Sequence, residues 1–243
     1  MTPATPPGYE NKPTDYFEQV RTEMLPFVPA HCRRVLDVGC GQGRFGELLK
    51  KNRQIEVWGV EPVQAAAAKA MARLDRVIAG QFDPQLNLPP GTFDCVIFND
   101  VLEHLLAPEE ALRYSKMLLA DGGVIVASIP NIRNLSTFWQ FMFHARWEYE
   151  DCGVLDRTHL RFFTKSSIVN LFQGEGYMLE SICGINAYVG IPNSSRRLWA
   201  AYHLANVFLL GKLGDMRFQQ FAVVAKPAPN RSAPRQANGV GNE

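Results

Sequence analysis

A glycine-rich turn between an apolar run and a helical pattern constrains the fold of this chain more than any other feature. The segment VLDVGCGQGRFGELL, residues 35–49, places Gly39, Gly41 and Gly43 between the two. A strand that runs into such a turn and then into a helix brings backbone amides and a helix N-terminus up to a ligand. The segment therefore predicts a ligand-binding strand–turn–helix unit.

Short apolar runs alternate with helical patterns along most of the chain. Strands are expected at residues 34–39, 56–61, 76–80, 93–98, 123–129, 177–184 and 220–225, and the best-marked helices at 108–119 and 166–176. Continuous apolar strands separated by helices are typical of a mostly parallel sheet covered on both faces. The pattern predicts an α/β, doubly wound fold, whose last strand could enter the sheet in either direction.

Both ends of the chain are rich in proline, glycine and polar residues. Residues 1–13 and 227–243 are therefore expected to be disordered tails on a single domain that spans 14–226.

Two internal segments do not fit a bare sheet. Residues 131–163 are rich in aromatic side chains, which suits a lid or substrate wall, or else a packed surface insertion. An apolar helical insertion at 186–215 contains the stretch 196–213, which is too short and too polar to cross a bilayer. We expect that stretch to be a buried helix, or else an interfacial or dimer helix, and we expect no membrane span.

Charge and cysteine usage exclude several classes of protein. Lys+Arg 25 against Asp+Glu 24 gives a net charge of +1, which supplies no field for nucleic acid or anionic lipid. Five cysteines without a CxxC pair indicate neither a disulfide framework nor a zinc site. The N-terminus has no signal-peptide core. We therefore expect a cytoplasmic protein with no nucleic-acid partner.

The residues around the glycine turn discriminate between nucleotide-like ligands. Arg44 stands where a dinucleotide fingerprint would have its third glycine, and no GK[ST] follows. Asp37, at the end of the strand, would repel a pyrophosphate but suits a ligand that carries an ammonium and a sulfonium group. Glu61, at the end of the next strand, can accept hydrogen bonds from ribose hydroxyls, as it also could from NAD. These features favour S-adenosylmethionine over NAD.

Three motifs resemble those of a known family. VLDVGCGQG, GVEP and FDCVIFNDVLEHL are similar to the first, second and fourth motifs of class I S-adenosylmethionine-dependent methyltransferases. The resemblance implies a seven-stranded Rossmann-like sheet whose last strand is antiparallel to the others, and S-adenosylmethionine as the cofactor.

The resemblance also implies which residues contact the cofactor. Asp37, Gly39 and Gly41 would face its methionine portion and Glu61 its ribose. The third motif departs from the family pattern at Gln81, which would contribute to the adenine contact through its backbone and side chain. The full expected set is Asp37, Gly39, Cys40, Gly41, Gly43, Glu61, Pro62, Gln81, Phe82, Asn99 and Asp100.

Two histidines are candidate catalytic residues, because a hydroxyl acceptor must lose its proton. His104 belongs to DVLEHL and His159 to LDRTHLRFF. Each also has a structural reading: His104 would order the turn before Pro108, and His159 would anchor the following helix. Adjacent Glu103 and His104 make a weak ligand pair, so no metal is expected.

DVLEHL and DRTHLRFFT together resemble a branch of the family common among bacterial small-molecule and polysaccharide methyltransferases. The expected function is methyl transfer to an oxygen of a small molecule or saccharide, for instance in polysaccharide biosynthesis. An N-methyltransferase of an amino sugar, a non-catalytic cofactor-binding module that docks to a partner, and an NAD-dependent oxidoreductase are the alternatives.

Overall fold

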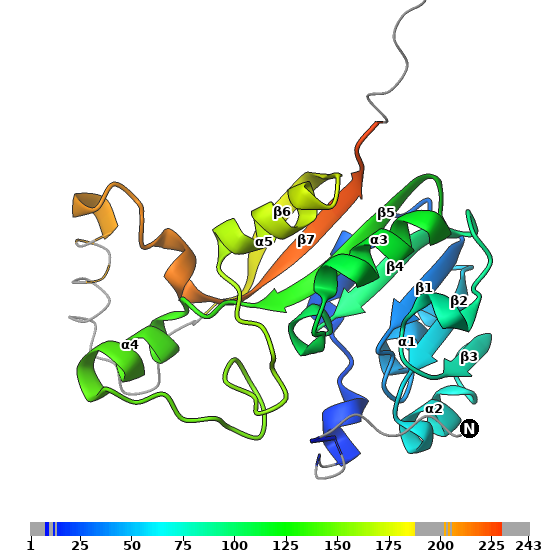
Figure 1. Cartoon of the computed structure of the whole chain (residues 1–243), viewed down its shortest axis with the longest axis horizontal. Coiled ribbons are helices and arrows are strands. Elements are labelled where there is room, and N and C mark those ends of the chain that lie inside the picture. Colours follow the sequence, from blue (N-terminus) through cyan, green and yellow to red (C-terminus); the bar gives the residue numbers. More distant parts are fainter. Residues whose placement is uncertain are drawn as a thin grey trace, which may run out of the picture.

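Seven strands form one sheet in the order β3-β2-β1-β4-β5-β7-β6 (Figure 1). The computed structural model describes residues 8–9, 12, 14–187, 202, 204 and 206–229. The strands are β1 (Arg34–Val38), β2 (Glu56–Glu61), β3 (Arg76–Ala79), β4 (Phe93–Asn99), β5 (Leu119–Pro130), β6 (Tyr177–Ala187) and β7 (Phe218–Pro227).

Strand direction confirms the expected Rossmann-like sheet. β1 pairs parallel with both β2 and β4, and β4 pairs parallel with β5. β7 is antiparallel to both of its neighbours, with Ile129 of β5 opposite Phe221. The strand order reverses between β1 and β4, and in such sheets ligands bind at the carboxyl ends of the strands beside that reversal.

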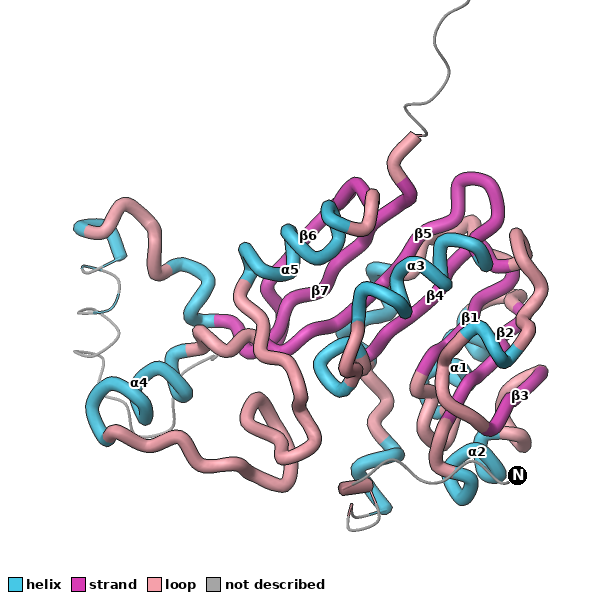
Figure 2. Tube along the Cα trace, viewed as in Figure 1, coloured by secondary structure: helices cyan, strands magenta, loops and turns pink. Residues whose placement is uncertain are grey.

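Helices cover both faces of the sheet (Figure 2). The α-helices are α1 (Arg44–Asn52), α2 (Gln64–Ala70), α3 (Pro108–Leu118), α4 (Leu135–His144) and α5 (Lys165–Gly174). Because side chains alternate along a strand, Leu36 packs in the cluster under α3 and α5, whereas Val35 packs in the other cluster, under α1. The predicted helix at 166–176 begins one residue early, where a Thr164–Ser167 capping box starts α5.

The described part of the N-terminal segment departs from the predicted tail. Tyr9 and Lys12 are not solvated but lie against the body of the domain, because Lys12 Nζ donates to Asp156 Oδ2 at 2.5 Å. Two short 3-10 helices, η1 (Thr14–Glu18) and η2 (Thr22–Phe27), follow. At the other end β7 continues to Pro227, and the rest of both predicted tails lies outside the described residues.

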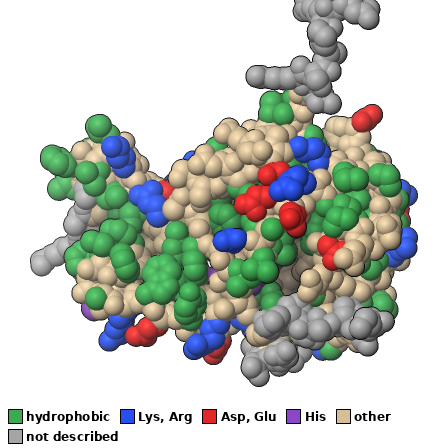
Figure 3. Space-filling view, viewed as in Figure 1, with side chains coloured by type: hydrophobic (Ala, Val, Ile, Leu, Met, Phe, Trp, Pro, Cys, Tyr) green, Lys and Arg blue, Asp and Glu red, His purple; other side chains and the backbone are tan. Residues whose placement is uncertain are grey.

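The aromatic segment 131–163 divides into two parts. Its first part contains α4, which extends away from the sheet and leaves side chains such as Phe141, Met142 and Phe143 more than half exposed (Figure 3). Its second part returns to the carboxyl ends of the strands, where Val154 and His159 line a cavity.

The second predicted insertion, 186–215, is described only in part. Residues 188–201, 203 and 205 lie outside the described residues, and Asn186 and Ala187 still belong to β6. Among the helices that the structure describes, none is long and apolar enough to cross a membrane.

Candidate active site

A cavity of about 610 Å³ lies at the carboxyl ends of β1, β2 and β4, within the usual size of a small-molecule site. Ten of the eleven residues expected to contact the cofactor line it, namely Asp37, Gly39, Cys40, Gly41, Glu61, Pro62, Gln81, Phe82, Asn99 and Asp100. Gly43 does not. It is the N-cap of α1 and packs against Ala70 and Leu74, so it serves the packing of the turn.

The glycine turn is held in a shape that only glycine fits well. Gly39 and Gly41 have positive φ angles of 66° and 53°. A Cβ on Gly39 would lie 2.6 Å from Val101 Cγ2, and one on Gly41 would lie 2.8 Å from the Phe17 carbonyl oxygen. The turn is therefore fixed by its close approach to η1 and to the segment after β4.

Asp37 brings a carboxyl group with one unpartnered oxygen into the cavity wall. Its side chain is buried, and Oδ2 has no hydrogen-bond partner among the described residues. Burial, with the charge of Glu61 as a second cause, raises the pKa of Asp37 to about 7. Such a group is satisfied by a cationic ligand.

Glu61 joins the ends of two neighbouring strands. Its carboxylate accepts the backbone N–H of Gly41 at 2.9 Å and that of Val63 at 2.9 Å. Burial raises its pKa, and these two hydrogen bonds oppose that shift. Glu61 therefore fixes the glycine turn and faces the cavity from the strand end where the ribose was expected.

Asn99 and Asp100, two of the expected cofactor contacts, line the cavity at the end of β4 as its floor residues and differ in their partners. Asp100, with φ 54°, accepts hydrogen bonds from Ser128 Oγ and Gln220 Nε2 and pairs with Arg21, so it ties together β4, β5 and β7. Asn99, in contrast, has a buried side-chain amide without a partner in the described part of the chain. Asn99 is thus the floor residue whose amide can serve a ligand.

The two candidate histidines lie side by side at the cavity wall. Their ring centroids are 4.7 Å apart. His104 Nδ1 donates to the Thr158 carbonyl at 3.1 Å and His159 Nδ1 to the Val154 carbonyl at 2.9 Å. Because a carbonyl only accepts, each Nδ1 carries the proton and each Nε2 keeps its lone pair.

Burial keeps both imidazoles uncharged at neutral pH. It lowers the pKa of His104 to about 4, with the neighbouring His159 as a second cause, and it lowers the pKa of His159 as well. Both rings therefore offer lone pairs rather than positive charge.

Glu103 lies against this histidine pair. Its side chain is 1% exposed, neither carboxyl oxygen has a hydrogen-bond partner within the described residues, and Oε1 is 3.9 Å from His159 Nε2. Burial raises the pKa of Glu103 to about 8. The Glu103 carbonyl accepts the N–H groups of Leu160 and Arg161, which docks the DRTHLRFF segment onto the end of β4.

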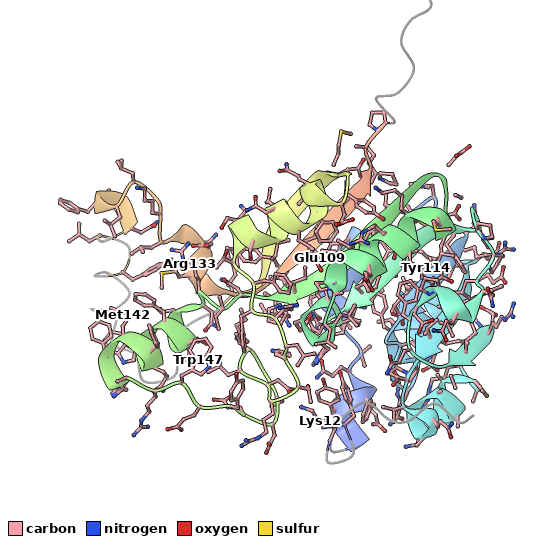
Figure 4. All side chains as sticks on the ribbon, viewed as in Figure 1. Lys12, Glu109, Tyr114, Arg133, Met142 and Trp147 are labelled. Atoms are coloured by element: carbon pink, nitrogen blue, oxygen red, sulfur yellow. The ribbon has the colours of Figure 1, made fainter. Side chains whose placement is uncertain are left out.

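The N-terminal segment covers the same end of the cavity. The Tyr16 hydroxyl lies 3.4 Å from His104 Nε2, and the Tyr9 ring is 5.7 Å from the imidazole. Phe17 also lines the cavity. Lys12 holds this segment in place through Asp156 and the Asp151 carbonyl, 2.6 Å away (Figure 4). Tyr9 and Lys12 have no signal in the sequence, because they precede the first periodic segment.

Comparisons with known proteins agree with this arrangement. A family model described as a methyltransferase domain matches residues 12–182. The ubiquinone biosynthesis O-methyltransferase of Azoarcus sp. (strain BH72) is 27% identical over 191 residues, which cover 74% of this chain and 79% of that protein. The protein of the same name from Psychrobacter arcticus is 30% identical over 183 residues, which cover 71% and 68%.

Solved structures share the fold. A SAM-dependent methyltransferase from Archaeoglobus fulgidus superposes with a TM-score of 0.64 at 23% identity, covering 86% of this chain and 94% of that one. The family match extends over most of the chain, and acidic and glycine residues line the cavity. This chain therefore belongs to the methyltransferase domain family and is a class I S-adenosylmethionine-dependent methyltransferase.

Proposed function

We propose that this enzyme transfers a methyl group to a hydroxyl oxygen of a small ring-bearing molecule. The observation that carries the proposal is the pair of imidazoles at the cavity wall, whose Nε2 lone pairs are kept by the Nδ1 hydrogen bonds to backbone carbonyls. An oxygen acceptor needs a proton acceptor at the moment of attack, and an uncharged imidazole is suited to that role. His104 and His159 are the proposed catalytic residues.

Bound S-adenosylmethionine supplies an electrophilic methyl group on its sulfonium. In this proposal the Asp37 carboxylate binds the ammonium group, Glu61 accepts from the ribose, and Pro62 with Phe82 flanks the adenine. The Asn99 amide is buried without a partner among the described residues, and it orients the ligand groups at the reacting end of the cavity. The chain thereby contributes mainly position, which can supply about 7–11 kcal/mol in favourable intramolecular cases.

The acceptor that the cavity favours is a phenol. The two relatives are named O-methyltransferases of ubiquinone biosynthesis. Aromatic side chains of Tyr9, Tyr16 and Phe17 line the cavity on its N-terminal side, and a flat ring packs well against such faces. A saccharide, the other ring class expected from the sequence, is the competing acceptor.

The test is transfer of a labelled methyl group from S-adenosylmethionine to matched panels of phenols, nucleotide sugars, free saccharides and amines. We expect label on phenolic oxygen, and a fall in kcat of about 10²-fold or more for His104→Ala. His31→Ala, which changes an exposed histidine, is the matched control. Label on amines alone, or on no acceptor although S-adenosylhomocysteine binds, would overturn the proposal.

A further inference from the structure

Two apolar segments extend away from the sheet on the same side of the molecule (Figure 1). The first runs from α4 to residue 149, and the second consists of the described residues of 204–210. Val207, Phe208 and Leu210 of the second segment are 72–88% exposed. The described part of the stretch 196–213 is thus largely exposed, although a buried helix was the first expectation for it. Six aromatic side chains of the first segment are 38–63% exposed, namely Phe138, Trp139, Phe141, Phe143, Trp147 and Tyr149.

The two segments, together called the apolar end here, are fixed to each other at their bases. Arg133, at the root of α4 (Figure 4), donates from one guanidinium nitrogen to Asp215 Oδ2 at 2.9 Å and from the other to the Lys212 carbonyl at 3.1 Å. Asn134 then caps α4, because its side chain accepts the Thr137 N–H. The apolar end is therefore one preformed surface rather than two independent loops.

The apolar end is larger than the apolar patches that single proteins leave uncovered. Phe141, Met142 and Phe143 are more than half exposed and point about 100° apart, so α4 is apolar around most of its circumference. Covering an aromatic side chain removes about 150–250 Å² of surface, so the six exposed ones offer about 400–700 Å². The second segment raises this to about the 800 Å² per partner that a stable interface buries, whereas the largest patch on a monomer is about 300–600 Å².

The margin of the first segment is acidic. Asp151 is paired with Arg157 on the exposed surface. The exposed charges of residues 145–150 are then those of Arg146, Glu148 and Glu150, which leave a net charge of −1. α4 itself contains no lysine, arginine, aspartate or glutamate. Helices that lie on anionic bilayers are instead rich in lysine and arginine, so charge does not favour a lipid surface for this segment.

The margin of the second segment is basic. Arg133 neutralises Asp215, so the exposed side chains of Lys212 and Arg217 leave a net charge of +2. One surface thus carries an acidic half and a basic half. Such a surface is complementary to itself, because a two-fold axis places the first segment of each copy against the second segment of the other.

We propose that the apolar end is the interface of a two-fold symmetric homodimer, in which α4 of each copy packs against residues 204–213 of the other. Each contact occurs twice, so the aromatic side chains are covered and an acidic margin meets a basic one at both places. Aromatic residues, methionine and arginine are the side chains enriched in protein interfaces. None of the described residues of 138–149 or 204–213 lines the cavity, so the dimer does not rest on the proposed function.

The first experiment is sedimentation of the full chain over a range of concentrations. We expect the wild type to be a dimer at about 10 µM. Phe143→Asp places a charge in the covered aromatic surface and should weaken the dimer about thirtyfold or more. Met117→Asp, at an apolar side chain of α3 that is 65% exposed and outside the apolar end, is the matched control and should dimerise as the wild type does.

A charge exchange tests which segments meet. Glu148→Lys with Glu150→Lys makes both margins basic, and Lys212→Glu with Arg217→Glu makes both acidic. Each double variant alone should dimerise at least tenfold more weakly, because like charges then face each other at both contacts. An equal mixture of the two should form a heterodimer as stable as the wild type, because opposite charges face each other again. Damage to folding would not be repaired by mixing.

A rise in Tm with S-adenosylhomocysteine, retained in all variants, shows that each is folded with an intact cofactor site. The proposal is overturned if the wild type remains a monomer, if Phe143→Asp dimerises as tightly as the wild type, or if the mixed charge variants do not associate. A monomeric wild type that binds phosphatidylglycerol vesicles, when Phe143→Asp does not, would make a lipid surface the occupant instead. Phenol methylation by a monomeric wild type would leave the proposed function standing.

Discussion

At the scale of single residues, Asp37 places a carboxylate where the folded chain alone has little to neutralise it. Burial raises its pKa to about 7, above the ordinary aspartate value of 3.8. Protonated Asp37 therefore stabilises the folded state relative to ionised Asp37. This contribution is complete below the pKa of the group in the unfolded chain and is lost as the pH rises through about 7. Asp37→Asn should therefore stabilise the cofactor-free protein at pH 8, by up to about 4 kcal/mol, with the gain shrinking toward pH 4. Urea denaturation at both pH values measures this.

The same variant should lose the cofactor. Replacing the carboxylate by a neutral amide removes the partner of the ammonium group, so the affinity for S-adenosylhomocysteine should fall at least tenfold. Asp121→Asn, at an exposed aspartate, should change neither the unfolding free energy nor the affinity for S-adenosylhomocysteine. Equal unfolding free energies of Asp37→Asn and the wild type at pH 8 would contradict the assigned burial cost.

The sequence could predict that the expected cofactor contacts meet at one cavity, because strand ends and glycine turns are local patterns. Asp37 and Glu61 each end an apolar run, and parallel strands bring such ends to one edge of the sheet. The contact between Glu103 and His159 was not predictable, because an irregular segment without periodicity separates them. Gly43 was predicted with the cofactor contacts but does not line the cavity, because it is the N-cap of α1, a position that the sequence does not distinguish from the turn itself.

At the scale of elements, the N-terminal segment is a strap to whose attachment the buried ion pair of Lys12 with Asp156 contributes. Lys12 and Asp156 side chains are 5% and 2% exposed. Lys12→Met removes the charge but keeps length, so residues 14–18 should detach from the cavity while the sheet stays folded. Hydrogen exchange of the amides in η1 should speed up about tenfold or more, with little change in Tm.

Lys51→Met is the control for this strap, because Lys51 pairs with Glu47 on the exposed surface of α1. Its exchange in η1 should match that of the wild type. A large fall in Tm for Lys12→Met, without selective exchange in η1, would show instead that the ion pair supports the whole domain.

The strands themselves were predicted to within a few residues, since buried parallel strands are continuous apolar runs. The structure extends β5 back to Leu119 and β6 on to Ala187, because pairing with neighbouring strands continues past the apolar core of each run. The part of the strap that precedes residue 14 was missed because a proline-rich composition predicts disorder, whereas Lys12 pairs there with Asp156.

At the scale of the whole molecule, cofactor binding should couple to global unfolding, because the cavity joins β1, β2, β4, η1 and the segment before α5. A ligand at 100 times its dissociation constant stabilises a protein by about 2.7 kcal/mol. For a domain of this size that is a rise in Tm of about 5–11 °C. S-adenosylhomocysteine should produce this shift, and NAD should not.

Glu61→Ala tests whether the rise in Tm comes from ligand bound in the cavity or from a nonspecific effect. The change removes the acceptor of the Gly41 and Val63 N–H groups, so the glycine turn loses its lock and the ribose its partner. The variant should have a lower Tm, and S-adenosylhomocysteine should no longer raise it. Glu109→Ala, in the first turn of α3 (Figure 4), should keep the rise in Tm. A full shift in Glu61→Ala would mean that the ligand stabilises the domain from another place, and the cavity would then have to be reassigned.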